Sequence, residues 1–148
     1  MNPNIPASYL ALIKDNKILL LRRCNTWYED WNYSMVAGHV DPGETFTKCM
    51  IREAKEEAGI ILLTQDLKVV HVMHRDSGMK EDNQRVDVFF TAKKWDWDIV
   101  NIEPHKCDDL SWFDLDNIPE NTIPCVKKAI EHIKNWVFYS EYGWKSID

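Results

Sequence analysis

Hydrophobic and polar residues alternate with a period of two in several stretches of the chain, and this pattern predicts β-strands. The expected strands cover residues 7–13, 17–23, 67–74, 85–94 and 111–115. The first two strands flank Asp15 and Asn16, a pair typical of a tight turn, so they are predicted to form a β-hairpin. A polar loop is expected over residues 76–84, and a short apolar segment over residues 33–40.

A helix is predicted from Thr45 to Ala58, where apolar residues recur at spacings of three and four. Its N-cap is expected to be Thr45 or Thr47, because a threonine hydroxyl accepts a hydrogen bond from a free backbone N–H. Gly59 comes just after the helical stretch, at the position where a left-handed glycine commonly ends a helix.

A second helix is predicted after the turn at residues 116–119. Thr122 is expected to cap it, and Pro124 is expected in its first turn. Its apolar stripe consists of Val126, Ala129, Ile130, Ile133 and Val137. Two tryptophans are expected in the core, Trp112 on a strand face and Trp136 on the apolar face of this helix. Strands and two helices together predict an α/β fold with a mixed β-sheet between helices.

The composition favours a single domain over residues 1–148, with enough apolar residues for a sizeable core. The net charge of −6 argues against an extended nucleic-acid surface, although a single nucleotide remains compatible with it. The four cysteines form no CxxC pair, so neither a zinc site nor a disulfide framework is predicted. There is no apolar run long enough to span a membrane and no signal-peptide pattern, and we therefore expect a cytoplasmic protein.

Glu53, Glu56 and Glu57 follow one another at helical spacing, which places their carboxylates about a turn apart on one face. Like charges so arranged repel each other unless a cation neutralises them. Carboxylate oxygens suit Mg²⁺ or Mn²⁺ better than zinc or copper. The alternative is a solvated acidic face, which is the more common meaning of such a pattern when it stands alone.

The surrounding residues favour the cation site, because residues 38–60, GHVDPGETFTKCMIREAKEEAGI, resemble the Nudix box. The match consists of Gly38, five residues, Glu44, seven residues, Arg52-Glu53, two residues, Glu56-Glu57, one residue and Gly59. Every fixed position is filled, although Ala54 is a small occupant of an apolar slot. The resemblance to Nudix hydrolases implies an α/β/α sandwich and hydrolysis of a nucleoside diphosphate linked to another moiety.

The resemblance also implies roles for the residues of the box. The metal ligands would be Glu53, Glu56, Glu57 and the backbone carbonyl of Gly38, with Mg²⁺ as the cofactor and Mn²⁺ as an alternative. Arg52 is expected to brace the carboxylates and to offset their charge, while Glu44 and Gly59 have structural roles.

The general base is expected to be Glu53 on the helix or a carboxylate from the loop after residue 94. Within that loop Glu103 is favoured over Asp98, because Pro104 stiffens the neighbouring chain and the glutamate side chain reaches further. The residues leave this choice open.

Substrate contacts are predicted at the end of the hairpin and in the loop that follows it. Arg22 and Arg23 are candidates for the phosphates, and strand alternation allows at most one of them to face the cleft. Trp27 and Tyr28 are candidates for stacking on a nucleobase. His39 is a candidate for a phosphate contact, and the weaker candidates are His105 and Lys106.

The substrate class is inferred from family signatures that are absent downstream of the box. Residues 75–79 contain neither the proline typical of the ADP-ribose branch nor the tyrosine of the diadenosine polyphosphate branch. A compact MutT-like form remains, so we expect Mg²⁺-dependent hydrolysis of a nucleoside triphosphate, or of a modified nucleotide, to nucleoside monophosphate and pyrophosphate. The alternatives are hydrolysis of ADP-ribose or a nucleotide sugar, and a non-catalytic nucleotide- or RNA-binding module. The complete set of box glutamates favours an enzyme. The expected partner is a small nucleotide, and a homodimer is left open.

Overall fold

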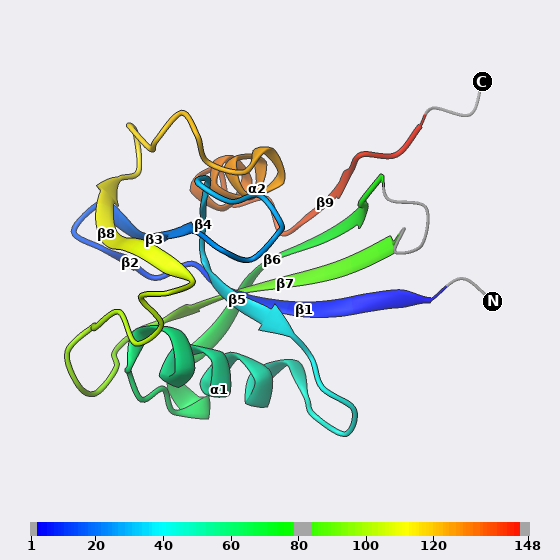
Figure 1. Cartoon of the computed structure of the whole chain (residues 1–148). Coiled ribbons are helices and arrows are strands. Elements are labelled where there is room, and N and C mark those ends of the chain that lie inside the picture. The colour runs from blue at the N-terminus through cyan, green and yellow to red at the C-terminus, as the bar shows by residue number, and fades with distance from the viewer. Residues whose placement is uncertain (1–2, 79–83, 146–148) are drawn as a thin grey trace.

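The computed structural model describes residues 3–78 and 84–145 and shows a mixed β-sheet with one helix on each side (Figure 1). The larger sheet has the strand order β5-β1-β7-β6-β9, and a smaller sheet is formed by β2, β3, β4 and β8. The strands are β1 (Asn4–Leu10), β2 (Ile13–Lys14), β3 (Lys17–Arg23), β4 (Tyr33–Ser34), β5 (Val36–His39), β6 (Leu67–Asp76), β7 (Gln84–Ala92), β8 (Cys107–Asp114) and β9 (Tyr139–Tyr142). The helices are α1 (Phe46–Ala58), α2 (Pro124–Lys134) and the short 3₁₀ helix η1 (Thr64–Asp66). The expected α/β architecture is confirmed.

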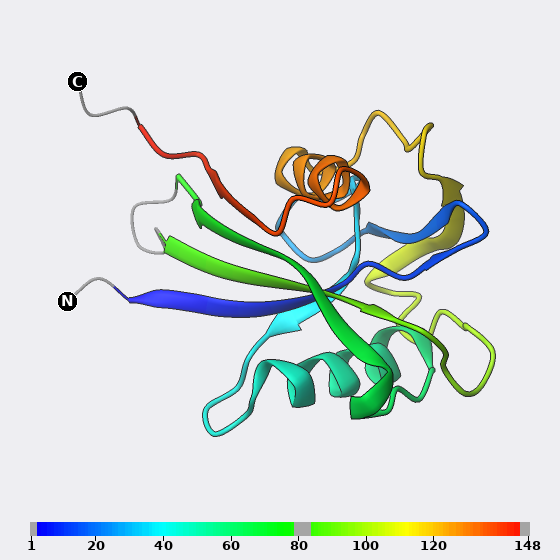
Figure 2. The same cartoon turned by 180° about the vertical axis from the view of Figure 1, so that it is seen from behind.

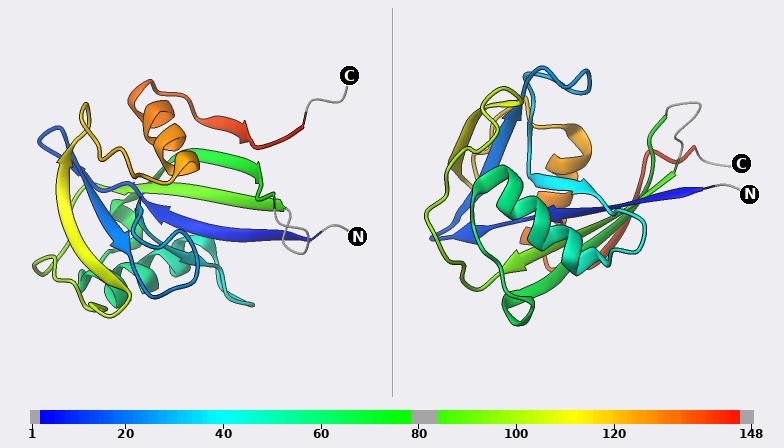
Figure 3. Two further views of the ribbon diagram at one scale, coloured as in Figure 1. Left: turned by 45° about the horizontal axis from the view of Figure 1, so that its top comes forward. Right: turned by 60° about the horizontal axis from the view of Figure 1, so that its bottom comes forward.

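The larger sheet is mixed, since β1 pairs with β7 and β6 pairs with β9 in parallel, while the remaining pairs are antiparallel. Seen from behind, β9 runs beside β6 at the edge of this sheet (Figure 2). The smaller sheet, in which β8 pairs with β3, stands at one end of the larger one (Figure 3).

The hydrophobic core has two parts, one on each face of the larger sheet. Successive side chains of a strand point to opposite faces, so Phe89 packs on the α2 side and its neighbour Phe90 on the α1 side. Met50 of α1 and Ile130 of α2 are fully buried against these two faces. Burying a side chain of this size stabilises the fold by about 1.5–3 kcal/mol. Both helices are therefore fixed to the sheet, which gives the end of α1 a defined position.

The predicted hairpin is present, and both turn residues have left-handed backbones, with φ of 53° at Asp15 and 61° at Asn16. Its first arm is interrupted, however, so residues 7–13 belong partly to β1 and partly to β2. The expected strand at residues 111–115 is longer and begins at Cys107, and β9 was not predicted. Of the loop expected over residues 76–84, residues 79–83 lie outside the described part of the chain.

The ends of α1 agree with prediction. Thr45 is the N-cap, its hydroxyl accepting a hydrogen bond from the N–H of Lys48 at 3.1 Å, and Gly59 has the left-handed φ of 68°. The prediction for α2 was correct in placing Pro124 in the first turn. It was wrong in making Thr122 the cap, because the Thr122 hydroxyl donates to the carbonyl of Pro119 instead.

The prediction for Trp136 was also wrong, whereas Trp112 packs against the core as expected. The helix ends at Lys134, two residues earlier, and Trp136 has a φ of 59° and is 75 % exposed. The apolar periodicity continues beyond the helix because the following chain, including Val137, turns toward β6. Sequence spacing alone does not distinguish this turn from another helical turn.

His71 of β6 holds that turning segment in place. Its buried ring bonds the Val137 carbonyl through Nδ1 at 2.7 Å and the Ser140 hydroxyl through Nε2 at 2.8 Å. The ring also stacks on His132, with centroids 5.2 Å apart. Burial lowers the pKa of His71 and the nearby His132 lowers it further, against the opposing effect of the hydrogen bond to Val137.

These contacts predict that the folding stability falls as the pH drops below about 6.5, the ordinary pKa of histidine. The unfolded chain then takes up a proton at His71 before the folded chain does, so protonation favours unfolding. We expect the loss of melting temperature between pH 7.5 and 5.5 to shrink in His71→Gln. His105→Gln, in an exposed loop, is the control. Equal pH slopes in all three proteins would contradict this assignment.

Candidate active site

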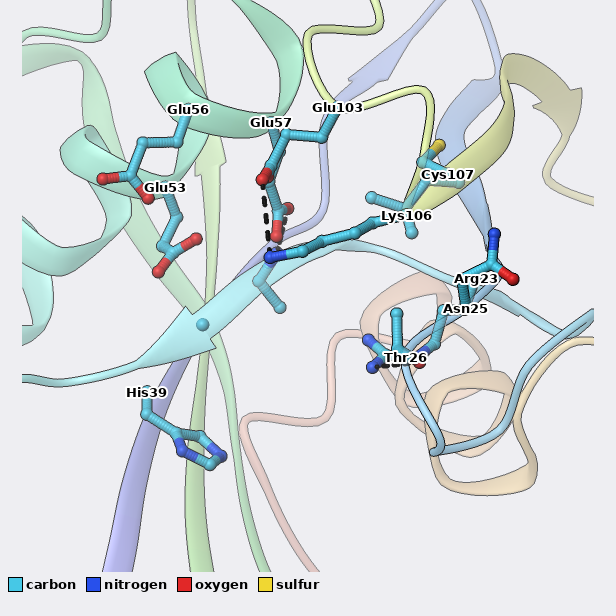
Figure 4. Close-up of a pocket in the computed structure, with 13 residues that line it drawn as sticks. Arg23, Asn25, Thr26, His39, Glu53, Glu56, Glu57, Glu103, Lys106 and Cys107 are labelled. Atoms are coloured by element: carbon cyan, nitrogen blue, oxygen red, sulfur yellow. Dashed lines mark hydrogen bonds and ion pairs between the residues drawn. The ribbon is translucent and has the colours of Figure 1, made fainter.

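A pocket of about 560 Å³ lies between the C-terminal half of α1, strand β5 and the loop that enters β8. Its lining includes four glutamates and three basic side chains, namely Glu53, Glu56, Glu57, Glu103, Arg23, His39 and Lys106. Figure 4 shows the glutamates gathered on the side of α1, with Arg23, Asn25 and Thr26 across the pocket from them. The structure thus brings most of the predicted site residues together.

Glu57 is the most deeply placed of these carboxylates. One of its oxygens accepts a hydrogen bond from the backbone N–H of Ala37 on β5 at 3.0 Å. Burial raises the pKa of Glu57 well above its ordinary value, and the negative charges of Glu53 and Glu103 raise it further. Burial likewise raises the pKa of Glu53. A cation among these groups would reverse the effect, since it favours the charged form of each carboxylate.

Arg52 holds the acidic residues of the box in a network at the helix surface. Its guanidinium donates two hydrogen bonds to Glu44, at 2.8 and 2.9 Å, and one to Glu53 at 2.7 Å. It also reaches Glu56 at 3.3 Å and the His39 carbonyl at 3.2 Å. The hydrogen bonds from Arg52 lower the pKa of Glu44 to about 2. Arg52 is therefore in the expected bracing position, and Glu44 is its anchor rather than part of the pocket wall.

Gly38 allows Glu53 to lie directly against the backbone of β5. A Cβ atom built at Gly38 would be 2.1 Å from Oε1 of Glu53, closer than any real contact. The Gly38 carbonyl faces the thiol of Cys49, at 3.4 Å from its sulfur. A residue with a side chain at position 38 would push the Glu53 carboxylate out of its place.

The donors on the α1 side of this pocket fit a hard divalent cation, because they are carboxylate oxygens and the Gly38 carbonyl. Cys107 also lines the pocket, but burial raises the pKa of its thiol, which donates to the Asp109 carbonyl. Among the residues that the structure describes, no three acidic, histidine or cysteine side chains already converge on one point. Glu53 and Glu56 are instead held by Arg52. A bound cation would therefore draw the carboxylates together and compete with Arg52 for them.

Of the two arginines at the end of β3, one faces the pocket and the other faces away, as strand alternation predicts. Arg23 lines the pocket and donates to the Tyr28 carbonyl at 2.9 Å and to the Thr26 hydroxyl at 3.2 Å. Arg22 makes a bidentate ion pair with Asp108, at 2.7 and 2.8 Å. Arg22 is thus placed outside the pocket, contrary to its candidacy for the phosphates.

The two aromatic candidates lie beyond the pocket walls. Trp27 is 99 % exposed with a φ of 66°, and Tyr28 is 41 % exposed with its ring 5.3 Å from the guanidinium carbon of Arg23. The loop that carries them is firmly held, since Asp30 accepts hydrogen bonds from the N–H and hydroxyl of Thr26 and from the N–H of Trp27. Stacking on a substrate would therefore occur at the pocket mouth.

The loop before β8 places one of the two candidate bases in the pocket. The N–H of Val100 donates to the Ala58 carbonyl and the N–H of Ile102 to the Glu57 carbonyl, which lays the loop along the end of α1. Glu103 consequently lines the pocket. Asp98, the other candidate base, does not line this pocket and lies in a separate hollow beside Trp95 and Trp97.

His39 is at the rim of the pocket, with Nε2 2.7 Å from Nη1 of Arg85 on β7. Lys106, one of the weaker candidates, lines the pocket as well. Its ammonium points toward the carboxylates of Glu103 and Glu57 (Figure 4) and lies 3.8 Å from Oε2 of Glu103. The signal available in the sequence was its position three residues after Glu103, whereas His105 between them stays outside the pocket walls.

Comparison with known proteins agrees with this geometry. Residues 4–134 match the family model described as the NUDIX domain. The chain is 29 % identical over 122 residues to the NAD-capped RNA hydrolase NudC of Chromobacterium violaceum, covering 82 % of this chain and 43 % of that protein. It therefore spans about two fifths of the length of the NudC relatives that it matches. None of the described helices is long and apolar enough to cross a membrane.

Two further similarities cover more of the other protein. The chain is 31 % identical over 138 residues to the ADP-ribose pyrophosphatase of Methanocaldococcus jannaschii, covering 90 % of this chain and 70 % of that one. The crystal structure of a MutT NUDIX hydrolase from Burkholderia pseudomallei superposes with a TM-score of 0.79 at 24 % identity, covering 88 % of this chain and 98 % of that one. The box residues, the fold and the family match together establish that this chain belongs to the Nudix family.

Proposed function

We propose that this protein is a pyrophosphohydrolase that cleaves a phosphoanhydride bond of a nucleotide with the help of Mg²⁺. The observation that carries the proposal is the pocket in which Glu53, Glu56 and Glu57 of α1 face Arg23 and Lys106. Acidic side chains on one wall suit a cation, and basic side chains on the other suit phosphate oxygens. A pyrophosphate group bound between the two walls would contact both.

The residues of the box would hold the cation through the carboxylates of Glu53, Glu56 and Glu57, with the Gly38 carbonyl as a further oxygen donor. A divalent cation in such a site screens the negative phosphate oxygens and lowers the pKa of an attacking water. Arg52 keeps the carboxylates in position, and Arg23 can orient a phosphate without losing its charge. Mn²⁺ is expected to replace Mg²⁺, because the donors are the same hard oxygens.

A carboxylate within hydrogen-bond reach of the attacking water is still required as the general base. The pocket offers Glu53 and Glu103 for this role. Glu103 remains our first choice because Arg52 does not hold it, whereas the Glu53 carboxylate accepts a hydrogen bond from Arg52 at 2.7 Å. Loss of turnover in Glu53→Gln with nearly full turnover in Glu103→Gln, at unchanged metal affinity, would assign the base to Glu53.

A nucleoside triphosphate is the substrate that we favour, with nucleoside monophosphate and pyrophosphate as products. The absence of the downstream proline at residues 75–79 supports this choice, and MutT-type hydrolases share its fold. ADP-ribose or a nucleotide sugar is the second candidate. The relative named ADP-ribose pyrophosphatase, which matches along most of this chain, favours it.

The substrate can be identified by incubating a panel of nucleotides with the protein and Mg²⁺ and separating the products. We expect release of pyrophosphate and nucleoside monophosphate from one or more of the ribo- and deoxyribonucleoside triphosphates. Turnover confined to ADP-ribose, nucleotide sugars or dinucleotides would replace the favoured substrate by the second candidate. Nucleotide binding without turnover of any compound would indicate a non-catalytic module.

A further inference from the structure

Lys106 has a fixed backbone and a long side chain that reaches across the pocket. Its N–H donates to the Glu103 carbonyl and its own carbonyl accepts from the N–H of Cys24, both at 2.9 Å. These bonds hold the backbone beside Arg23. From this root the side chain extends across the pocket, where its ammonium lies 3.8 Å from Oε2 of Glu103 (Figure 4).

The N–H groups of this ammonium form fewer hydrogen bonds with the described part of the protein than those of Arg23. Arg23 gives its N–H groups to Tyr28 and Thr26, and His39 contacts Arg85. In the described part of the chain Lys106 forms one ion pair, with Glu103 at 3.8 Å, which is too long for a hydrogen bond. Its side chain is 57 % exposed. Its three N–H donors are thus available to a ligand that enters the pocket.

Exposed lysine–glutamate pairs three residues apart usually contribute little to folding stability. Lys106 differs from an ordinary surface lysine in facing several carboxylates that are themselves candidate ligands of a cation. In the absence of metal, the positive charge of this ammonium partly offsets the negative charge of the glutamates in the pocket. The ammonium shares the pocket with the carboxylates that would hold a metal ion.

We propose that Lys106 is a phosphate-binding residue that moves from the acidic wall to the substrate when the metal site is filled. This role rests on the proposed function of the pocket. A divalent cation held by Glu53, Glu56 and Glu57 would repel the ammonium, because both carry positive charge. The flexible four-carbon stem then allows the ammonium to reach a phosphate oxygen of the substrate, to which lysine binds as a compact point charge.

The proposal predicts opposite effects of Lys106→Met on the two ligands. Removing a positive charge from the pocket that would hold the metal should strengthen Mn²⁺ binding in the absence of nucleotide by about 3- to 10-fold. Losing a charge-assisted hydrogen bond should lower kcat/KM at saturating Mg²⁺ by about 10- to 100-fold. A merely structural lysine would change both quantities in the same direction or neither.

Two matched variants complete the test. Lys106→Arg keeps the charge and should restore wild-type Mn²⁺ affinity with part of the kcat/KM. Lys128→Met removes a lysine that is 47 % exposed and also pairs with a glutamate three residues away, Glu131 on α2, and should leave both quantities unchanged.

The measurements are calorimetric titration with Mn²⁺ and steady-state kinetics with the nucleotide that the substrate panel identifies. Tighter Mn²⁺ binding together with a lower kcat/KM in Lys106→Met supports the proposed movement of Lys106 to the substrate. Values equal to those of Lys128→Met, or a fall in both, would overturn it. Failure of the proposed function itself gives a different result, in which the wild-type protein shows neither saturable Mn²⁺ binding nor turnover.

Discussion

Glu57→Gln is expected to lower the rate of nucleotide cleavage by at least about 100-fold while the fold stays intact. The glutamine side chain has nearly the same shape and retains an oxygen that can accept the hydrogen bond from Ala37. It lacks the negative charge at the deepest point of the pocket, and loss of a preorganised charge-stabilising group typically costs this much in rate. We expect the same loss for Glu56→Gln.

Circular dichroism and thermal melting show whether the fold survives, and steady-state kinetics measure the rate. In the absence of metal the melting temperature of Glu57→Gln should be equal to or higher than that of the wild type, because burial and the neighbouring Glu53 and Glu103 disfavour the charged form of Glu57. Glu131→Gln on the exposed face of α2 is the control for the loss of one carboxylate. Undiminished turnover in both box variants would exclude these residues from the site.

Gly38→Ala is expected to reduce turnover by a similar factor, about 100-fold, through a steric rather than an electrostatic cause. The new methyl group would overlap the carboxylate end of Glu53, which must move away from β5. Because this end is flexible and Gly38 is not among the glycines with positive φ, the fold should survive. Activity is then lost with little change in stability.

Gly43→Ala is the matched control and should show the reverse pattern. Gly43 has a φ of 79° and no atom within 4 Å of its added Cβ, so the substitution strains the backbone without touching the pocket. A cost of about 1 kcal/mol in folding free energy is expected, with turnover unchanged. Full activity of Gly38→Ala would show that the place of Glu53 against β5 is not required.

Periodicity predicted the fold where one face of an element is buried and its ends carry clear signals. The helix α1 is such a case, because Met50 and Ala54 face the core while Thr45 and Gly59 mark its ends. Periodicity failed beyond α2, where apolar residues continue into a turn. There Val137 makes its contacts through its backbone carbonyl to His71, which a pattern of side chains does not reveal.

The residues of the candidate site that come from a single segment of the chain could be predicted from the sequence. Glu53, Glu56 and Glu57 are brought together by helical spacing alone. Glu103 and Lys106 come from a loop whose position depends on backbone hydrogen bonds to the end of α1, such as that from Ile102 to Glu57. Such bonds are long-range and independent of side-chain type, and for this reason the sequence did not show that Glu103 lines the pocket while Asp98 lies outside it.

The dependence of the hydrolysis rate on free Mg²⁺ tests the central claim most directly. We predict no turnover in excess EDTA and a saturable recovery as free Mg²⁺ is raised, with pyrophosphate-bond cleavage as the reaction throughout. Recovery should also follow addition of Mn²⁺. Full turnover in excess EDTA would contradict the assignment of the acidic wall as a metal site.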